Sequence, residues 1–284
     1  MKPSRPILRY HGGKWRLAEW IISQFPEHRR YVESFGGGAS VLLRKHRSFT
    51  EVYNDLDSEV VNVFRIARDE GDRLVRALEL TPFAREEFEG TYEPTNDRLE
   101  MARRTIIRSF MGFGSNAVNS SHRTGFRGSS ERSGTTPAHD WNNFPAALKA
   151  IINRLRGVVI EHKDAMEVIE KYDGPEVLHY VDPPYVHDTR VRVNAARGYR
   201  HEMTDEQHRD LAKLLHEVKG AVVLSGYASP LYDQELYAGW ERIEKTGPFA
   251  DGALQRTEVL WLRNIQADLF TTARRCRPPG RTEG

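Results

Sequence analysis

Short apolar segments of strand-forming residues alternate along the chain with segments of helical periodicity. Strands that alternate with helices form βαβ units, which predict an α/β fold with a mostly parallel sheet covered by helices on both faces. The expected strands span residues 31–35, 51–55, 158–162, 177–182, 221–226 and 258–262.

The clearest helix follows Thr204. Thr204 and Gln207 have the spacing of a capping box, in which each side chain bonds the other residue's backbone amide. Apolar residues then recur at helical spacing on one face. They are Leu211, Leu214, Leu215 and Val218.

The alternation is interrupted between about residues 67 and 156, where the chain is helical and charged and then, over 112–136, rich in Gly, Ser, Asn and Arg. Loops this long and polar are usually functional or disordered. We therefore expect a core formed by residues 1–66 and 157–270, an inserted domain over 67–156, and a basic, flexible tail over 271–284.

Positive charge is concentrated in the insertion. The net charge is only +2, but residues 101–132 hold six arginines against one acid, Glu131, a local excess of +5. Such a stretch predicts a surface for an anionic partner. The arginines are Arg103, Arg104, Arg108, Arg123, Arg127 and Arg132.

The single cysteine, Cys276, excludes an intrachain disulfide and a cysteine-rich zinc site. No run approaches the roughly 20 apolar residues that a membrane-spanning helix needs, and the first residues lack the apolar centre of a signal peptide. No His, Asp or Glu spacing demands a metal. We expect a cytoplasmic protein without a metal ion.

A glycine-rich turn ends the first expected strand, in the sequence Glu-Ser-Phe-Gly-Gly-Gly-Ala-Ser over residues 33–40. Glycines at such a junction let the backbone approach a ligand without a Cβ in the way. An ordinary tight turn fits this feature alone equally well.

Asp55 ends the next strand, where nucleotide-binding α/β folds place an acid on ribose hydroxyls. Asp55 alone also fits a helix cap, and the glycine turn favours the cofactor role.

The most specific motif is Asp182-Pro183-Pro184-Tyr185, after the apolar strand. Consecutive prolines remove two amide donors and hold the chain extended, so the Asp182 carboxylate and the backbone carbonyls keep a fixed direction. Such acceptors suit an amino group, and Tyr185 suits stacking on a base. The competing interpretation is a proline-stiffened loop with an exposed tyrosine.

In this order, the motifs at 9–14, 33–40, 54–55, 182–185 and 225–227 resemble the Dam-like family of adenine-specific DNA methyltransferases, over most of residues 7–265. The resemblance implies a Rossmann-like methyltransferase core with an inserted, mainly helical DNA-recognition domain. It further implies S-adenosylmethionine as the methyl donor, and an adenine flipped out of double-stranded DNA as the acceptor.

The resemblance also assigns roles to residues. It implies cofactor contacts by Tyr10 and Lys14 at the methionine end, Phe35 and Gly37 lining the pocket, Asp55 on the ribose, Asp164 near the adenine, and Asp182. It implies a catalytic group of Asp182, Pro183, Pro184 and Tyr185, in which Asp182 and the Pro183 carbonyl accept hydrogen bonds from the target amine and Tyr185 stacks on the flipped base.

The chain departs from the family pattern at three places. Tyr10 stands where Trp is common, and Ala39 stands where a second loop glycine is usual, which puts the backbone angles of that loop in question. Residues 112–127 do not reproduce the recognition sequence of the members that read GATC, so that target is not assigned to this chain.

On the DNA side, we expect the arginines of the insertion to neutralise phosphates and some of four residues to read base edges in the major groove. The four are Asn116, Asn119, Arg123 and Arg127. Residues 190–200, with four arginines and no acid, are a second candidate for phosphate contact.

Two alternatives stay open: a methyltransferase acting on RNA or on a protein amide, and a DNA-binding relative that has lost catalysis. Asp182 at the head of its motif and the basic insertion favour adenine in DNA, and the presence of Lys14, Asp55 and Asp182 favours activity. We expect a monomer or weak dimer in a bacterial or phage-infected cell. Whether a restriction nuclease accompanies it is left open.

Overall fold

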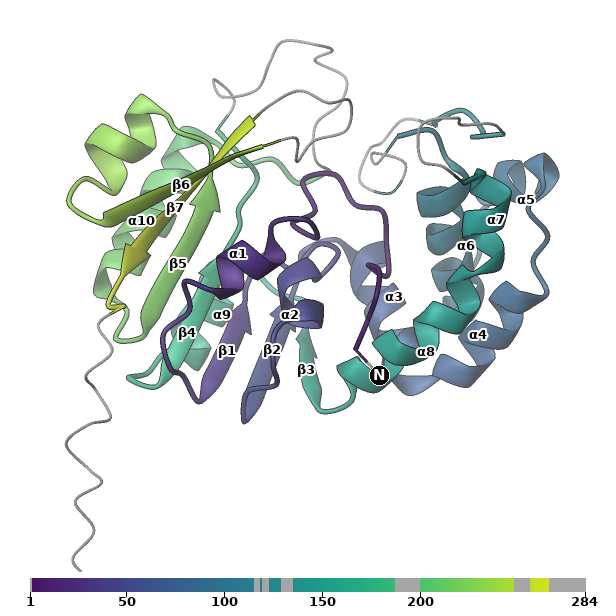
Figure 1. Cartoon of the computed structure of the whole chain (residues 1–284), viewed down its shortest axis with the longest axis horizontal. Coiled ribbons are helices and arrows are strands. Elements are labelled where there is room, and N and C mark those ends of the chain that lie inside the picture. Colours follow the sequence, from purple (N-terminus) through teal and green to yellow (C-terminus); the bar gives the residue numbers. More distant parts are fainter. Residues whose placement is uncertain are drawn as a thin grey trace, which may run out of the picture.

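In the part of the chain that the structure describes, seven strands form one mixed sheet in the order β3-β2-β1-β4-β5-β7-β6 (Figure 1). The computed structural model describes residues 2–114, 118, 123–128, 135–186, 200–247 and 256–265. The strands are β1 (Arg30–Glu33), β2 (Thr50–Asn54), β3 (Val158–Glu161), β4 (Val177–Val181), β5 (Ala221–Gly226), β6 (Glu241–Gly247) and β7 (Arg256–Arg263). β1 to β5 are parallel, whereas β7 runs antiparallel to both of its neighbours.

The six expected strands are confirmed, and one strand, β6, was not expected. Within the described ranges, β6 pairs only with β7 and forms an edge of the sheet. Its sequence, Glu-Arg-Ile-Glu-Lys-Thr-Gly, has one large apolar residue, Ile243, which packs against the core. Charged side chains are usual on an edge strand, where they oppose pairing with another chain. Because β6 is charged, its sequence lacks the apolar pattern by which the other strands were predicted.

Helices cover both faces of the sheet, as expected for parallel strands. They are α1 (Ala18–Ile22), α2 (Ser40–Arg44), α3 (Ser58–Asp69), α4 (Gly71–Glu79), α5 (Arg85–Gly90), α6 (Arg98–Met111), α7 (Pro137–Asn142), α8 (Phe144–Leu155), α9 (Ala165–Tyr172) and α10 (Asp205–Glu217), with a π-helix at Leu231–Leu236. The expected capping box is present at the start of α10, between Thr204 and Gln207.

Side chains along the strands alternate between the two covered faces. Tyr31 and Tyr53 pack in a cluster that includes residues of α1, α2 and α3, while Val32 and Val52 pack against α9 on the opposite face. The strand order reverses between β1 and β4, because β2 and β3 lie on one side of β1 and β4 and β5 on the other. Open α/β sheets bind ligands outside the carboxyl ends of their strands at such a point.

Helices α4 to α8 lie within the expected insertion over 67–156, and Figure 1 shows them beyond the β3 edge of the sheet. This region shares one hydrophobic cluster with the sheet, since Ile106 of α6 and Leu148 of α8 belong to the same cluster as Tyr53 and Leu178. Helix α3 runs through residues 66 and 67, where the sequence placed the first domain boundary. The insertion is therefore packed onto the core rather than tethered to it.

A buried ion network also joins the insertion to the sheet. Glu51 of β2 accepts bonds from Lys45 Nζ at 2.8 Å and from the Arg154 guanidinium of α8 at 2.5 and 2.8 Å. Arg154 also donates to the Leu42 carbonyl at 2.6 Å. The side chains of Lys45, Glu51 and Arg154 are only 3–8% exposed. Burial alone disfavours the charged Glu51, but the bonds from Arg154 and Lys45 outweigh it and lower the pKa of Glu51.

Candidate active site

A cleft open to solvent lies at the carboxyl ends of β1 to β4. Its walls come from residues 10–14, 33–38, 54–57, 163–166 and 200–203, together with Ser40, Val41, Tyr180, Asp182, Pro184 and Gln207. All seven residues expected to contact a cofactor line this one space: Tyr10, Lys14, Phe35, Gly37, Asp55, Asp164 and Asp182. The structure therefore brings together residues that are spread over most of the chain.

The glycine turn after β1 needs glycine for reasons of space and of backbone angle. A Cβ on Gly36 would lie 2.1 Å from the Tyr53 ring, and one on Gly37 would lie 2.8 Å from the Tyr10 ring. Gly37 has a φ of +47°. Ala39 nevertheless adopts the left-handed conformation, with φ 52° and ψ 36°, which costs a residue with a Cβ roughly 1–2 kcal/mol. The loop thus keeps its turn without the usual glycine at 39.

Asp55 supports this turn from the neighbouring strand. Its Oδ2 accepts a bond from the Gly37 amide at 2.7 Å, and its Oδ1 accepts one from the Asp57 amide at 2.8 Å. Burial raises the pKa of Asp55, and these two bonds only partly offset the rise. The helix cap of α3 is Asp57, which accepts bonds from the Glu59 and Val60 amides. Asp55 is therefore not the helix cap that its sequence context also allowed.

Asn54 fixes the ends of three adjacent strands. Its side-chain amide donates to the Ser34 carbonyl after β1 at 2.9 Å and to the Lys163 carbonyl after β3 at 3.0 Å. Its Oδ1 accepts a bond from the Lys163 amide at 2.9 Å. The sequence singled out Asn54 only as the neighbour of Asp55. Its bonds hold the three loops that form one wall of the cleft.

The Asp182 carboxylate lies at the edge of the cleft beside Lys14. The Lys14 ammonium is 2.9 Å from Asp182 Oδ1, and the two side chains are 5% and 17% exposed. Burial raises the pKa of Asp182 to about 6; Lys14 opposes this rise, and the nearby Glu258 adds to it. Asp182 is therefore mostly ionised at neutral pH and able to accept hydrogen bonds.

Tyr185 packs beside the cleft. Its side chain is buried, with the Lys14 ammonium 4.7 Å from the centre of its ring and the Tyr227 ring centred 4.4 Å away at 55°. Its hydroxyl accepts a bond from Lys14 and donates one to Glu258 at 2.9 Å. Of the four residues in the motif, Asp182 and Pro184 line the cleft, whereas Pro183 and Tyr185 are buried. The buried position of Tyr185 excludes the competing interpretation of a loop with an exposed tyrosine.

Glu33, at the end of β1, is a buried acid on the wall of the cleft. Burial raises its pKa to about 8, even though the Tyr31 hydroxyl and the Leu42 amide donate bonds to Oε2 at 2.6 and 2.9 Å. Glu33 is therefore mostly protonated at pH 7.

Asp164, which was expected near a bound adenine, caps α9 by accepting a bond from the Met166 amide at 2.8 Å.

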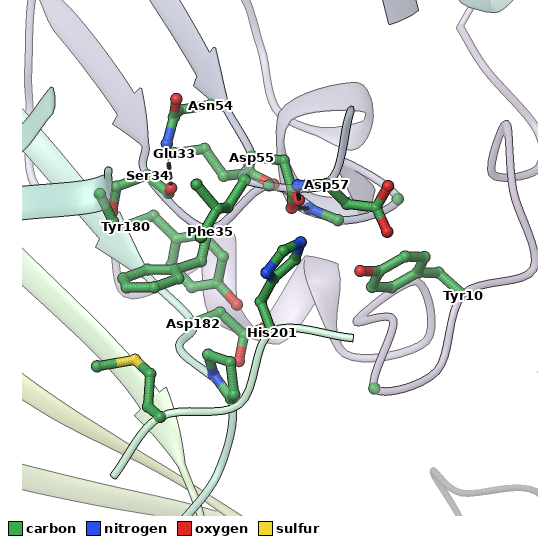
Figure 2. Close-up of a pocket in the computed structure, with 18 of the residues that line it drawn as sticks. Tyr10, Glu33, Ser34, Phe35, Asn54, Asp55, Asp57, Tyr180, Asp182 and His201 are labelled. Atoms are coloured by element: carbon green, nitrogen blue, oxygen red, sulfur yellow. Dashed lines mark hydrogen bonds between the residues drawn. The ribbon is translucent and has the colours of Figure 1, made fainter. Parts of the chain in front are cut away.

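The segment 200–203 closes one side of the cleft, and sequence reasoning did not foresee this. Arg200 lies 3.1 Å from Asp57 and 3.5 Å from Glu59, so it holds the segment near the start of α3. Figure 2 shows His201 pointing from this segment toward Asp55. Arg200 is the one described member of the basic loop 190–200, and it bonds to protein carboxylates.

Three of the six arginines counted at 101–132 make ion pairs within the protein. The pairs are Arg103 with Glu87 and Glu100, Arg104 with Glu100, and Arg108 with Glu59. These acids lie outside the counted window, so the local excess of +5 overstates the charge available to a partner. Arg123 is exposed, with its guanidinium 4.9 Å from the centre of the Tyr92 ring, and Arg127 is half-buried. Arg132, Asn116, Asn119, Cys276 and the tail 271–284 lie outside the described residues.

Within the described ranges, no helix has the length and apolar character to cross a membrane. The same part of the chain contains no group of three or more His, Cys, Asp or Glu side chains placed to hold a metal ion.

Comparison with known proteins gives consistent matches. The sequence profile of the D12 class N6 adenine-specific DNA methyltransferases matches residues 10–246, a range that includes every segment lining the cleft. The type II methyltransferase M.MjaIII of Methanocaldococcus jannaschii is 23% identical over 266 residues, which cover 83% of this chain and 89% of that protein. The DNA adenine methylase of Haemophilus influenzae is 24% identical over 273 residues, which cover 90% of this chain and 91% of that protein.

Among solved structures, the putative methyltransferase yhhF from Escherichia coli aligns over 88% of this chain and 84% of its own. Its sequence identity is 13% and its TM-score 0.34, too low to define a shared fold. The family assignment rests on the sequence profile, which spans most of the chain: this protein belongs to the D12 class of N6 adenine-specific DNA methyltransferases.

Proposed function

We propose that the cleft binds S-adenosylmethionine and that Asp182 receives, at its edge, the exocyclic amine of an adenine rotated out of a DNA duplex. The observation that carries this proposal is that the glycine turn, Asp55 and the Asp182 carboxylate line a single space at the switch point of the sheet. The family names adenine in DNA as the acceptor, which favours this reading over RNA or a protein amide.

The residues that line the cleft fit this cofactor. Apart from Glu33, which is mostly protonated at pH 7, acids outnumber the Lys and Arg cations there by five to three, which suits a ligand carrying positive charge on sulfur and on an amino group. The five acids are Asp55, Asp57, Asp164, Asp182 and Glu202, and the cations are Lys14, Lys163 and Arg200. The Gly37 backbone also offers close approach, because it has no Cβ between the chain and a ligand.

The chain's own residues would prepare the amine for methylation. Bound S-adenosylmethionine supplies an electrophilic methyl group on a sulfonium. The amine of adenine is a poor nucleophile, because its lone pair is delocalised into the ring. Hydrogen bonds from its two N–H groups to Asp182 and to the Pro183 carbonyl would favour a pyramidal nitrogen with its lone pair directed away from them. Tyr185, two residues after Pro183, would stack on the base, which requires the base to replace part of the packing that buries its ring.

The DNA side of the proposal assigns target recognition to the inserted region 67–156. Arg123 and Arg127 are the described arginines of its loop, and neither is part of the three internal ion pairs of α6. Contacts from Arg123 and Arg127 to DNA phosphates would make the affinity for DNA fall steeply with salt concentration.

The reaction is tested with purified protein, labelled S-adenosylmethionine and unmethylated duplex DNA of mixed sequence, followed by single-molecule sequencing. We expect label on adenine, with the methylated positions clustered in one short sequence. Omitting the cofactor is the control. If the protein bound the duplex but transferred no label to it, the proposal would be wrong, and the alternative of a DNA-binding relative without catalysis would take its place.

The role of Asp55 is tested by replacement. We expect Asp55→Ala to weaken binding of S-adenosylmethionine roughly 10- to 100-fold, because a hydrogen bond to a charged group contributes about 1.5–3 kcal/mol. Asp55→Asn keeps an oxygen acceptor and should lie between wild type and alanine. Titration calorimetry measures the affinity, and Asp210→Ala on the exposed face of α10 is the matched control. Equal affinities for all four proteins would exclude Asp55 from the cofactor site.

A further inference from the structure

Glu258 of β7 is a buried acid that no motif singled out. It is 4% exposed, and a charge removed from water is costly unless it is paired and hydrogen-bonded. One of its oxygens, Oε1, meets three partners: the Ser225 hydroxyl at 2.7 Å, the Tyr185 hydroxyl at 2.9 Å and the Lys14 ammonium at 3.4 Å. These three contacts therefore offset the cost of burying the Glu258 carboxylate.

Two of these partners are residues of the proposed active site. The Lys14 ammonium touches Asp182 as well as Glu258, so it bridges the two carboxylates. Lys14 also donates to the Tyr185 hydroxyl, which in turn donates to Glu258. Glu258 is not among the residues that line the cleft. It lies behind Lys14 and Tyr185, where it can act on the reaction only through them.

We propose that Glu258 is a positioning residue for methyl transfer, whose carboxylate holds the Tyr185 hydroxyl and the Lys14 ammonium so that the Tyr185 ring and the Asp182 carboxylate keep their places. This inference rests on the proposed function, since it needs Asp182 to accept the target amine. The proposal means that β7, which follows residues 182–185 by more than 70 positions, also supports the catalytic group.

The arrangement also sets the charge around Asp182. Two carboxylates share one ammonium, so the three charges sum to −1 when all are ionised. Glu258 accordingly raises the pKa of Asp182, while Lys14 lowers it. The titratable groups that face Asp182 are Lys14 of the N-terminal loop, Glu33 of β1, Tyr180 of β4, Tyr185, Tyr232 of the π-helix and Glu258 of β7.

Replacing Glu258 by glutamine, which removes the charge but keeps the length of the side chain, distinguishes a positioning role from a purely structural one. In wild type, kcat/KM for DNA should fall on the acid side as Asp182, with a pKa of about 6, becomes protonated. In Glu258→Gln, removal of a negative neighbour should move this midpoint to lower pH by roughly one unit. At neutral pH, kcat/KM should fall roughly tenfold, because Lys14 and Tyr185 lose a charged partner.

Two further variants complete the experiment. Glu258→Asp keeps the charge but shortens the side chain, so its midpoint should stay at the wild-type pH while KM for DNA rises. Glu244→Gln removes an exposed charge from β6, opposite Val259 of β7, and should leave the whole profile unchanged. Thermal melting of each variant checks the fold.

The outcomes are distinguishable. If Glu258→Gln lost activity only in step with lost folding, with its midpoint unmoved, Glu258 would be a structural residue and the inference would be overturned. A fully active Glu258→Gln with the wild-type profile would overturn it as well. A wild-type protein that methylated no duplex would instead refute the proposed function on which the inference rests.

Discussion

Replacing Asp182 by alanine is expected to lower the rate of methyl transfer about 10²- to 10³-fold, the usual cost of removing one preorganised polar group from a transition state. The variant loses the acceptor that would hold the amine and meet the positive charge developing on nitrogen. Lys14 keeps Glu258 and the Tyr185 hydroxyl as partners, so the fold should survive. Single-turnover transfer with enzyme in excess over DNA measures the chemical step.

Binding measurements accompany this experiment, because a loss of DNA affinity would produce a similar fall at low enzyme concentration. Asp182→Asn is the matched variant. It retains an oxygen acceptor at the same position without the charge, so its rate should lie between those of wild type and alanine. An alanine variant with the full single-turnover rate would refute the mechanism.

The second large effect concerns stability. Glu51→Ala should lower the free energy of unfolding by about 3–5 kcal/mol, because it leaves the buried cations of Lys45 and Arg154 without their shared carboxylate. Urea denaturation at pH 7 measures the change. The pKa of Glu51 is lowered in the folded protein, so its contribution is present above the ordinary glutamate pKa and is lost as pH falls through the folded-state value.

Two comparisons show whether the buried charges cause the loss of stability in Glu51→Ala. Glu235→Ala removes an exposed partner of Arg209 and should change stability by about 1 kcal/mol or less. The triple variant Glu51→Leu, Lys45→Met, Arg154→Met removes all three charges together and should recover much of the loss. A Glu51→Ala protein as stable as Glu235→Ala would show that the network contributes little.

Much of the site could be predicted from the sequence because its signals are local. The glycine turn, Asp55 and the Asp182 motif each follow an apolar strand, and the carboxyl ends of parallel strands meet at one edge of a sheet. Phe35, Gly37, Asp55 and Asp182 belong to these segments and line one cleft. Tyr10, Lys14 and Asp164, which line it as well, came only from the family resemblance. The sequence alone did not exclude a helix cap for Asp55, because the start of α3 depends on backbone angles; the structure gives that role to Asp57.

The remaining features depend on pairing between distant parts of the chain. Glu258 reaches Tyr185 because β7 inserts beside β5 in the antiparallel sense, and an acid opening a strand looks like an exposed residue when read alone. The ion pair of Arg108 is with Glu59, 49 positions earlier. Charge counts within a window cannot show such neutralisation, which is why the insertion seemed more basic than it is.

The hydrophobic cluster common to the sheet and the inserted helices limits how such an enzyme can be re-engineered. A graft that exchanged 67–156 for the corresponding helices of a relative would break contacts on both sides of the junction, including the bond between Arg154 and the Leu42 carbonyl. Chimeras should fold only when the buried faces of donor and recipient match. Under the proposed assignment of target recognition to 67–156, we expect new target preferences to be more accessible through substitutions at exposed positions such as Arg123 than through exchange of the whole segment.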